Sequence, residues 1–82
     1  MKLNDNVKIS KTTYDYYKLI SGSFADLVLK HKNNVGIIIY IDTFKASTSQ
    51  RCAVKFNEKD TLNFLSGELT LITMNRNGAN AN

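Results

Sequence analysis

The sequence of 82 residues has no proline, no tryptophan, a single cysteine and four glycines. One cysteine excludes an intramolecular disulfide, and the lack of proline with few glycines argues against long flexible linkers. The longest apolar run, 35–41, has seven residues, whereas a transmembrane helix needs roughly 20. The N-terminal segment MKLNDNVKIS has no apolar stretch after its lysine, so we expect no signal peptide. These absences predict one cytoplasmic domain over 1–74, without membrane association, and a flexible polar tail over 75–82.

Groups that carry chemistry are also scarce. With one cysteine and one histidine, the chain lacks the ligands of a structural zinc site. His31 lies between Lys30 and Lys32, a setting typical of a solvated face. The seven carboxylates fall mostly in predicted turns, and no glycine-rich phosphate loop occurs. We therefore expect no enzymatic activity, no metal and no cofactor.

Alternating apolar and polar residues predict five short strands. In the third, RCAVKF, the Cys52, Val54 and Phe56 side chains share the inward face, so the cysteine is expected to be a buried small apolar residue. The tyrosine-rich segment between the first two strands indicates a long surface loop, and SGEL indicates a tight or single helical turn. The strands are predicted over 6–10, 35–42, 51–56, 61–65 and 69–72.

The segment 23–34 fits two structures. Ser23 followed by Asp26 resembles a helical capping box, and Phe24, Leu27, Val28 and His31 then share one helical face. Read with period two, Leu27, Leu29 and His31 line one side of a strand instead. We favour a short helix that ends at one of the two asparagines.

The most apolar strand, 35–42, is expected to bend or bulge at Gly36. Strict alternation points Ile37, Ile39 and Ile41 into the core and Ile38 and Tyr40 outward. The outward pair is then either an interaction patch beside Phe44 or a face covered by the segment around 24–28.

The order of these elements resembles the SH3-like barrels of the KOW type, as in small tailed-phage proteins. The matching residues are Val7, Ile9, Gly36, Ile38, Ile41, Val54, Phe56, Phe64, Leu69, Leu71 and Ile72. The chain departs from the family pattern at Asn4 and Asn6, because the first strand of such barrels often begins with glycine at these positions. The resemblance implies a mainly β fold, a small five-stranded antiparallel barrel with one short helix inserted before the second strand. Barrels of this type bind RNA, DNA or other proteins, so the resemblance does not fix the function.

Two classes of partner follow. Nucleic acid would be bound by lysines that meet phosphates and tyrosines that stack bases. The candidate residues are Lys11, Tyr14, Tyr16, Tyr17, Lys18, Lys30, Lys32, Lys45 and Arg51. Alternatively these tyrosines only cover the small core.

A protein partner would contact the candidate residues Ile38, Tyr40 and Phe44. Because the net charge of +4 is modest and the lysines are scattered, we favour a host protein, with nucleic acid or a homo-oligomer as alternatives. The sequence thus predicts a small non-enzymatic, phage-type regulatory protein that docks on a host protein.

Overall fold

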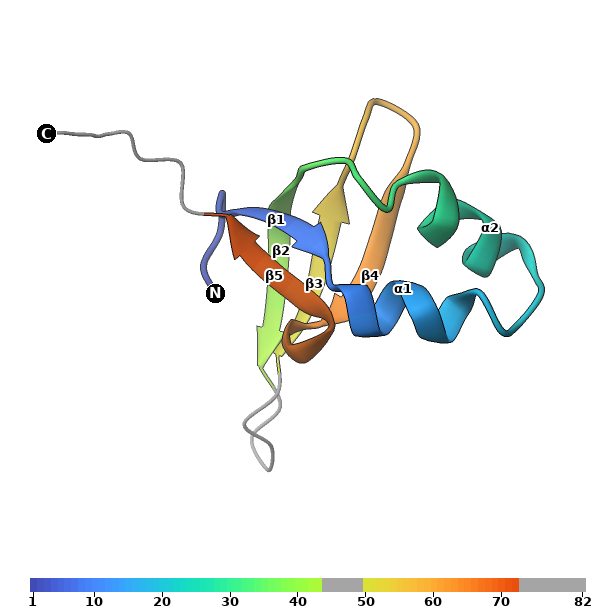
Figure 1. The fold of residues 1–82 in the computed structure, drawn as a ribbon. Coiled ribbons are helices and arrows are strands. Elements are labelled where there is room, and N and C mark those ends of the chain that lie inside the picture. Colours follow the sequence, from blue (N-terminus) through green and yellow to red (C-terminus); the bar gives the residue numbers. More distant parts are fainter. Residues whose placement is uncertain (44–49, 73–82) are drawn as a thin grey trace, which may run out of the picture.

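The computed structural model describes residues 1–43 and 50–72, which form a five-stranded antiparallel sheet with two α-helices, a mixed α/β arrangement (Figure 1). The strand order is β4-β3-β2-β1-β5, so the last strand pairs with the first. The five predicted strands and their antiparallel pairing are confirmed, whereas a mainly β fold with one helix is wrong. The described sheet is open, with β4 and β5 at its edges. The elements are β1 (Asn6–Ile9), α1 (Lys11–Tyr17), α2 (Ser23–Lys30), β2 (Gly36–Thr43), β3 (Gln50–Lys55), β4 (Thr61–Leu65), η1 (Ser66–Glu68) and β5 (Leu69–Ile72).

Helix α1 occupies most of the segment that was expected to be a loop. Ser10 leaves β1 in an extended conformation and its Oγ accepts a hydrogen bond from the backbone N–H of Thr13 at 3.2 Å. Serine is a preferred N-cap because it satisfies one of the free amides of the first turn. The buried Thr13 hydroxyl in turn donates to the carbonyl of Glu68 at 2.9 Å. The helix is therefore capped by the end of β1 and attached to η1, just before β5.

Helix α2 confirms the prediction of a helix in this segment. The predicted capping box is wrong, because the helix is capped by Gly22 and Ser23 is already its first residue. Gly22 has a φ of 139°, a conformation that side chains rarely allow. The predicted apolar face is confirmed: Val28 is fully buried, and Phe24 and Leu27 pack against the core.

The core lies between one face of the sheet and the two helices. Phe24 of α2 contacts Phe64 of β4 with ring centroids 5.8 Å apart, and Figure 1 shows α2 next to α1 beyond the end of β1. Cys52 is fully buried, as predicted. The buried cluster consists of Val7, Ile9, Val28, Ile38, Cys52, Val54, Leu62, Phe64 and Leu69.

A β-bulge in β2 determines which of its side chains face the core. The register with β3 shifts between Ile38, which lies opposite Val54, and Tyr40, which lies opposite Ala53, so Ile39 has no partner of its own. A bulge inserts one residue and reverses the alternation beyond it.

The predicted orientation of this strand is consequently wrong at three positions. Ile38 is fully buried, whereas Ile37 and Ile39 are 44% and 48% exposed. Tyr40, which is 61% exposed, and Ile41, which packs against the core, follow the prediction. The predicted bend at Gly36 falls instead at the bulge, and Gly36 allows the close approach of the Val54 and Phe56 side chains.

The remaining predictions concern residues outside the described ranges. They are Phe44 and Lys45, which follow β2 in the sequence, and the polar tail 75–82.

Candidate nucleic-acid interface

A cleft of about 550 Å³ lies between α1, the loop after α2 and the paired strands β1 and β5. This volume is within the usual range of small-ligand sites. Its walls carry four lysines and one carboxylate, together with a tyrosine, an asparagine and a threonine. The lining residues are Lys8, Ile9, Lys11, Tyr14, Asp15, Lys18, Lys32, Asn33, Thr70 and Ile72.

The helical repeat of α1 brings three of these side chains together. Lys11, Tyr14 and Lys18 are separated by three and four residues, so they project from one side of the helix. Lys18 is the C-cap residue, and its backbone N–H bonds to the carbonyl of Tyr14. A lysine at this end of a helix also faces the negative pole of the helix dipole. The cleft wall is therefore a direct result of the helix that sequence reasoning missed.

Tyr14 is the centre of the cluster. The Lys32 Nζ lies 4.6 Å from the centroid of its ring and donates a hydrogen bond to its hydroxyl at 3.1 Å. The Lys18 Nζ lies over the same ring at 5.3 Å. An ammonium group within about 6 Å of an aromatic centroid is attracted by the ring quadrupole. Two cations from different elements thus converge on one half-buried tyrosine.

The charge of the cleft is positive because only one of its lysines is neutralised. Lys11 forms an ion pair with Asp15 at 2.6 Å. This contact raises the pKa of Lys11 and lowers that of Asp15, in both cases mainly through the hydrogen bond between the two side chains. Within residues 1–43 and 50–72, Lys8, Lys18 and Lys32 form no ion pair with a carboxylate. These three ammonium groups remain available to an anionic ligand.

The other predicted nucleic-acid residues are dispersed. Tyr17 packs against the core and contacts Phe24 with ring centroids 5.4 Å apart, and burial raises the pKa of its hydroxyl. Tyr16 is 59% exposed but does not line the cleft. Arg51 lies on β3, opposite Asp42, away from the cleft lining. The structure therefore groups Lys11, Tyr14, Lys18 and Lys32 and separates the rest, with Lys45 outside the described residues.

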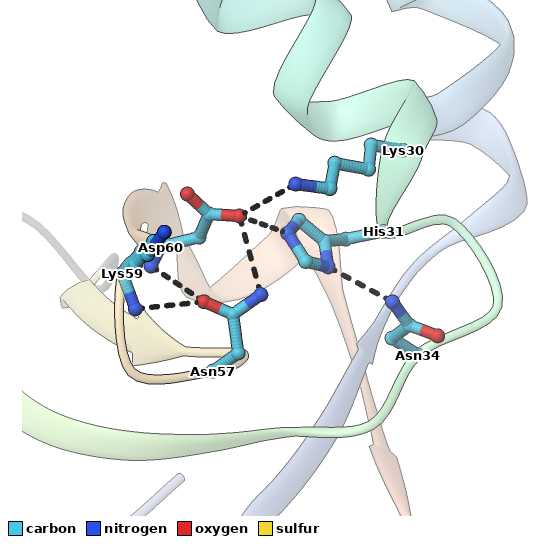
Figure 2. Close-up of polar contacts among 6 residues, drawn as sticks. All are labelled: Lys30, His31, Asn34, Asn57, Lys59 and Asp60. Carbon is cyan, nitrogen blue, oxygen red and sulfur yellow. Dashed lines mark hydrogen bonds and ion pairs between the residues drawn. The ribbon is translucent and has the colours of Figure 1, made fainter.

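Lys30 belongs to a different network, shown in Figure 2. Its Nζ lies 3.2 Å from Asp60, whose carboxylate also contacts the Nε2 of His31 at 2.8 Å. The Asn34 amide nitrogen lies 2.9 Å from the other ring nitrogen of His31. Because an ionised carboxylate can only accept, the Nε2 of His31 donates the hydrogen bond to Asp60.

This network overturns the prediction of a solvated His31, which is only 2% exposed. Its ring stacks on Phe56 with centroids 4.7 Å apart. The hydrogen bond from His31 is the main reason that the pKa of Asp60 is lowered; partial desolvation opposes it, and Lys30 and Asn57 assist it. The network holds the loop that carries Lys32 against the β3–β4 turn.

Sequence reasoning missed Lys8, Asn33 and Thr70. Lys8 is on β1, where it lies opposite Thr70 of β5. The alternation in 6–10 already placed Lys8 on the face opposite Val7 and Ile9, which was the available signal. The pairing that brings Thr70 beside it joins the two ends of the domain and leaves no local pattern in the sequence.

The candidate protein-binding residues Ile38 and Tyr40 do not lie on one exposed face. Ile38 is in the core, so its prediction as an exposed contact residue is wrong. Tyr40 is exposed, with Ile37 and Ile39 nearby on the same strand, and a hollow of about 300 Å³ lies beside these two isoleucines. Segment 24–28 packs in the same core cluster as Ile38, so the predicted covering by this segment is confirmed for Ile38. It is wrong for Tyr40, which is 61% exposed.

Reactive groups are few in the part of the chain that the structure describes. No three His, Cys, Asp or Glu side chains come together as metal ligands there. The Cys52 thiol is buried, and desolvation raises its pKa, which disfavours the reactive thiolate. Neither described helix has the length and apolar character needed to cross a membrane.

No family model, no curated protein and no solved structure matches this chain.

Proposed function

We propose that this protein binds nucleic acid through the cleft around Tyr14. The observation that carries the proposal is the convergence of Lys8, Lys18 and Lys32, without paired carboxylates, on a cleft of about 550 Å³. Phosphate groups are the natural partners of clustered ammonium groups, and their contacts supply most of the affinity in binding that does not depend on sequence.

The small number of lysines in the cleft determines how strongly nucleic acid should bind and how steeply its affinity should fall with salt. Three phosphates neutralised on a single strand give a slope of about −2 in a plot of log affinity against log salt concentration. Affinity should therefore fall roughly 15- to 20-fold between 50 and 200 mM salt. This is modest binding, consistent with a net charge of only +4.

Fluorescence anisotropy with labelled single-stranded and duplex oligonucleotides tests this function. We expect replacement of Lys8, Lys18 and Lys32 by glutamine to lower affinity roughly tenfold or more at low salt and to flatten the salt dependence. The matched control replaces Lys2, Lys55 and Lys59, three exposed lysines outside the cleft, by glutamine. No binding at low salt, or an equal loss in both triple variants, would contradict the proposal.

A second candidate function is docking on a partner protein through the outer face of β2. The observation that favours it is the cluster of Ile37, Ile39 and Tyr40, which are between 44% and 61% exposed. An apolar patch on a surface strand is a common feature of interaction sites. Tyr40→Asp should preserve the urea unfolding midpoint and abolish capture of a partner from nuclease-treated host lysate. Leu19→Asp, at an exposed apolar site elsewhere, should preserve both the midpoint and the capture. A partner that both variants retain would exclude this face.

We further propose that the domain is an SH3-like barrel. Support comes from the strand order, in which β5 lies beside β1 and β1 to β4 follow in sequence. Closure requires the free edge of β4 to approach β5, which would slow hydrogen exchange at the β4 amides on that edge. Rapid exchange there would contradict closure.

A further inference from the structure

We propose that the Tyr14 cleft binds the phosphate group of its ligand and no base, with Tyr14 acting as a support for lysine ammonium groups. This inference rests on the proposed function and specifies its chemistry. It assigns the cleft to phosphate esters, and it predicts that a nucleic-acid strand is held there by its backbone.

Two lysine ammonium groups already occupy the ring of Tyr14. Stacking of a base needs an open aromatic face. Tyr14 is half-buried and packs against the core, while the ammonium groups of Lys18 and Lys32 lie over its ring. Tyr16, the most exposed tyrosine of α1, does not line the cleft. The aromatic ring in the cleft is therefore used by cations.

The two cations on the Tyr14 ring are arranged in a way that favours an anion between them. Lys18 and Lys32 come from different elements and are both attracted to one ring, although their like charges repel each other. An anion between the ammonium groups would remove this repulsion. Lysine binds phosphate as a point charge without the fixed geometry of arginine, so the recognition is suited to a phosphate in any sequence context.

The backbone that carries Lys32 is held in place before the ligand binds. Its neighbour His31 is buried, bonded through both ring nitrogens and stacked on Phe56. A supported site binds more tightly because less conformational freedom is lost on binding.

Two uncharged side chains of the cleft, Asn33 and Thr70, add hydrogen-bond donors to its wall. Among the described residues, the amide of Asn33 and the hydroxyl of Thr70 have no side-chain hydrogen bond partner. Both groups can donate to a phosphate oxygen. The carboxylate of Asp15 opposes an anion, but it is held by Lys11 at 2.6 Å.

The experiment compares two single strands of equal length, one with normal bases and one with abasic sites throughout, together with inorganic pyrophosphate. We expect the two strands to bind within about threefold of each other, because the cleft contacts only phosphates. Pyrophosphate should shift the NMR resonances of Tyr14, Lys18, Lys32 and Asn33.

Two substitutions of Tyr14 distinguish a ring that supports lysine ammonium groups from a ring that stacks on a base. Tyr14→Phe keeps the ring and should retain binding of both strands within about threefold, whereas Tyr14→Leu should lose roughly three- to tenfold for both strands equally. Asp15→Asn removes the opposing charge and should increase the affinity of pyrophosphate. A normal strand that binds at least tenfold more tightly than the abasic strand, with the difference lost in Tyr14→Leu, would overturn the proposal in favour of stacking.

The same measurements distinguish failure of the two proposals. If pyrophosphate shifts the cleft resonances but neither strand binds, nucleic-acid binding fails and the phosphate site stands. If both strands bind without shifting those resonances, the phosphate site is overturned and nucleic-acid binding at another surface stands.

Discussion

His31 donates a hydrogen bond to Asp60 over 2.8 Å, joining the end of α2 to the turn between β3 and β4 across 29 residues of sequence. The Asp60 carboxylate also forms an ion pair with Lys30 and accepts a hydrogen bond from the side-chain amide of Asn57. The side-chain oxygen of Asn57 accepts hydrogen bonds from the backbone N–H groups of Lys59 and Asp60. One buried imidazole therefore links the turn, the helix and the loop that leads to the cleft.

We expect His31→Ala to destabilise the domain by about 2–4 kcal/mol, the range for truncation of a large buried side chain. The variant leaves Asp60 without its main partner and removes the ring that stacks on Phe56. Urea unfolding followed by circular dichroism measures the effect. Lys59→Ala changes an exposed side chain of the same turn and should stay within about 0.5 kcal/mol. Equal stability of His31→Ala and wild type would contradict a structural role for the network.

The pH dependence of stability should depend on Asp60. Its folded-state pKa is lowered from the ordinary 3.8, mainly by the hydrogen bond from His31. A carboxylate with a lowered folded-state pKa stabilises the folded state above its unfolded pKa, and this stabilisation is lost as the pH falls through the folded-state value.

The wild-type protein should therefore lose its advantage over Asp60→Asn as the pH is lowered from about 5 to about 2. The measurement is the difference between the urea midpoints of the two proteins at each pH. A constant difference across this range would show that the charge of Asp60 does not contribute.

Elements that follow from local sequence patterns were predicted, whereas features that depend on contacts between residues distant in sequence were missed. The strands around Cys52 and Phe64 were predictable because their alternation is regular and their inward residues are apolar. Helix α1 was missed because its buried side consists of threonine and tyrosine, which have polar tips and weak helix propensity, although the cap at Ser10 was visible in the sequence. The environment of His31 depends on Asp60, so its two lysine neighbours gave a misleading indication.

The same limit applies to the candidate site. Lys11, Tyr14 and Lys18 were named because they are close together in sequence, and their helical spacing would have placed them on one side of α1. Lys32 and Lys8 reach the cleft through the α2–β2 loop and the β1–β5 pairing. Those contacts depend on tertiary packing that no local pattern records.

The bulge in β2 predicts losses of stability of very different size for the same substitution at two adjacent isoleucines. Ile38→Ala should cost about 2–5 kcal/mol, because it removes a fully buried side chain from a small core. Ile39→Ala should cost less than about 1 kcal/mol, because Ile39 is bulged outward and 48% exposed. Urea unfolding of the two variants is a matched comparison of the same substitution. A larger loss for Ile39→Ala would restore strict alternation and place the bulge elsewhere.

Gly36 and Gly67 form a second matched pair. A Cβ on Gly36 would overlap the side chain of Val54 and lie 2.9 Å from a ring carbon of Phe56, whereas a Cβ on Gly67 would meet nothing within 4 Å. Neither position requires a positive φ, so the two alanine substitutions differ mainly in the space available. Gly36→Ala should destabilise the domain by about 1–3 kcal/mol through overpacking, and Gly67→Ala should stay within about 0.5 kcal/mol of wild type. Thermal and urea unfolding measure both, and an equally tolerated Gly36→Ala would contradict the close approach of β2 to Val54 and Phe56.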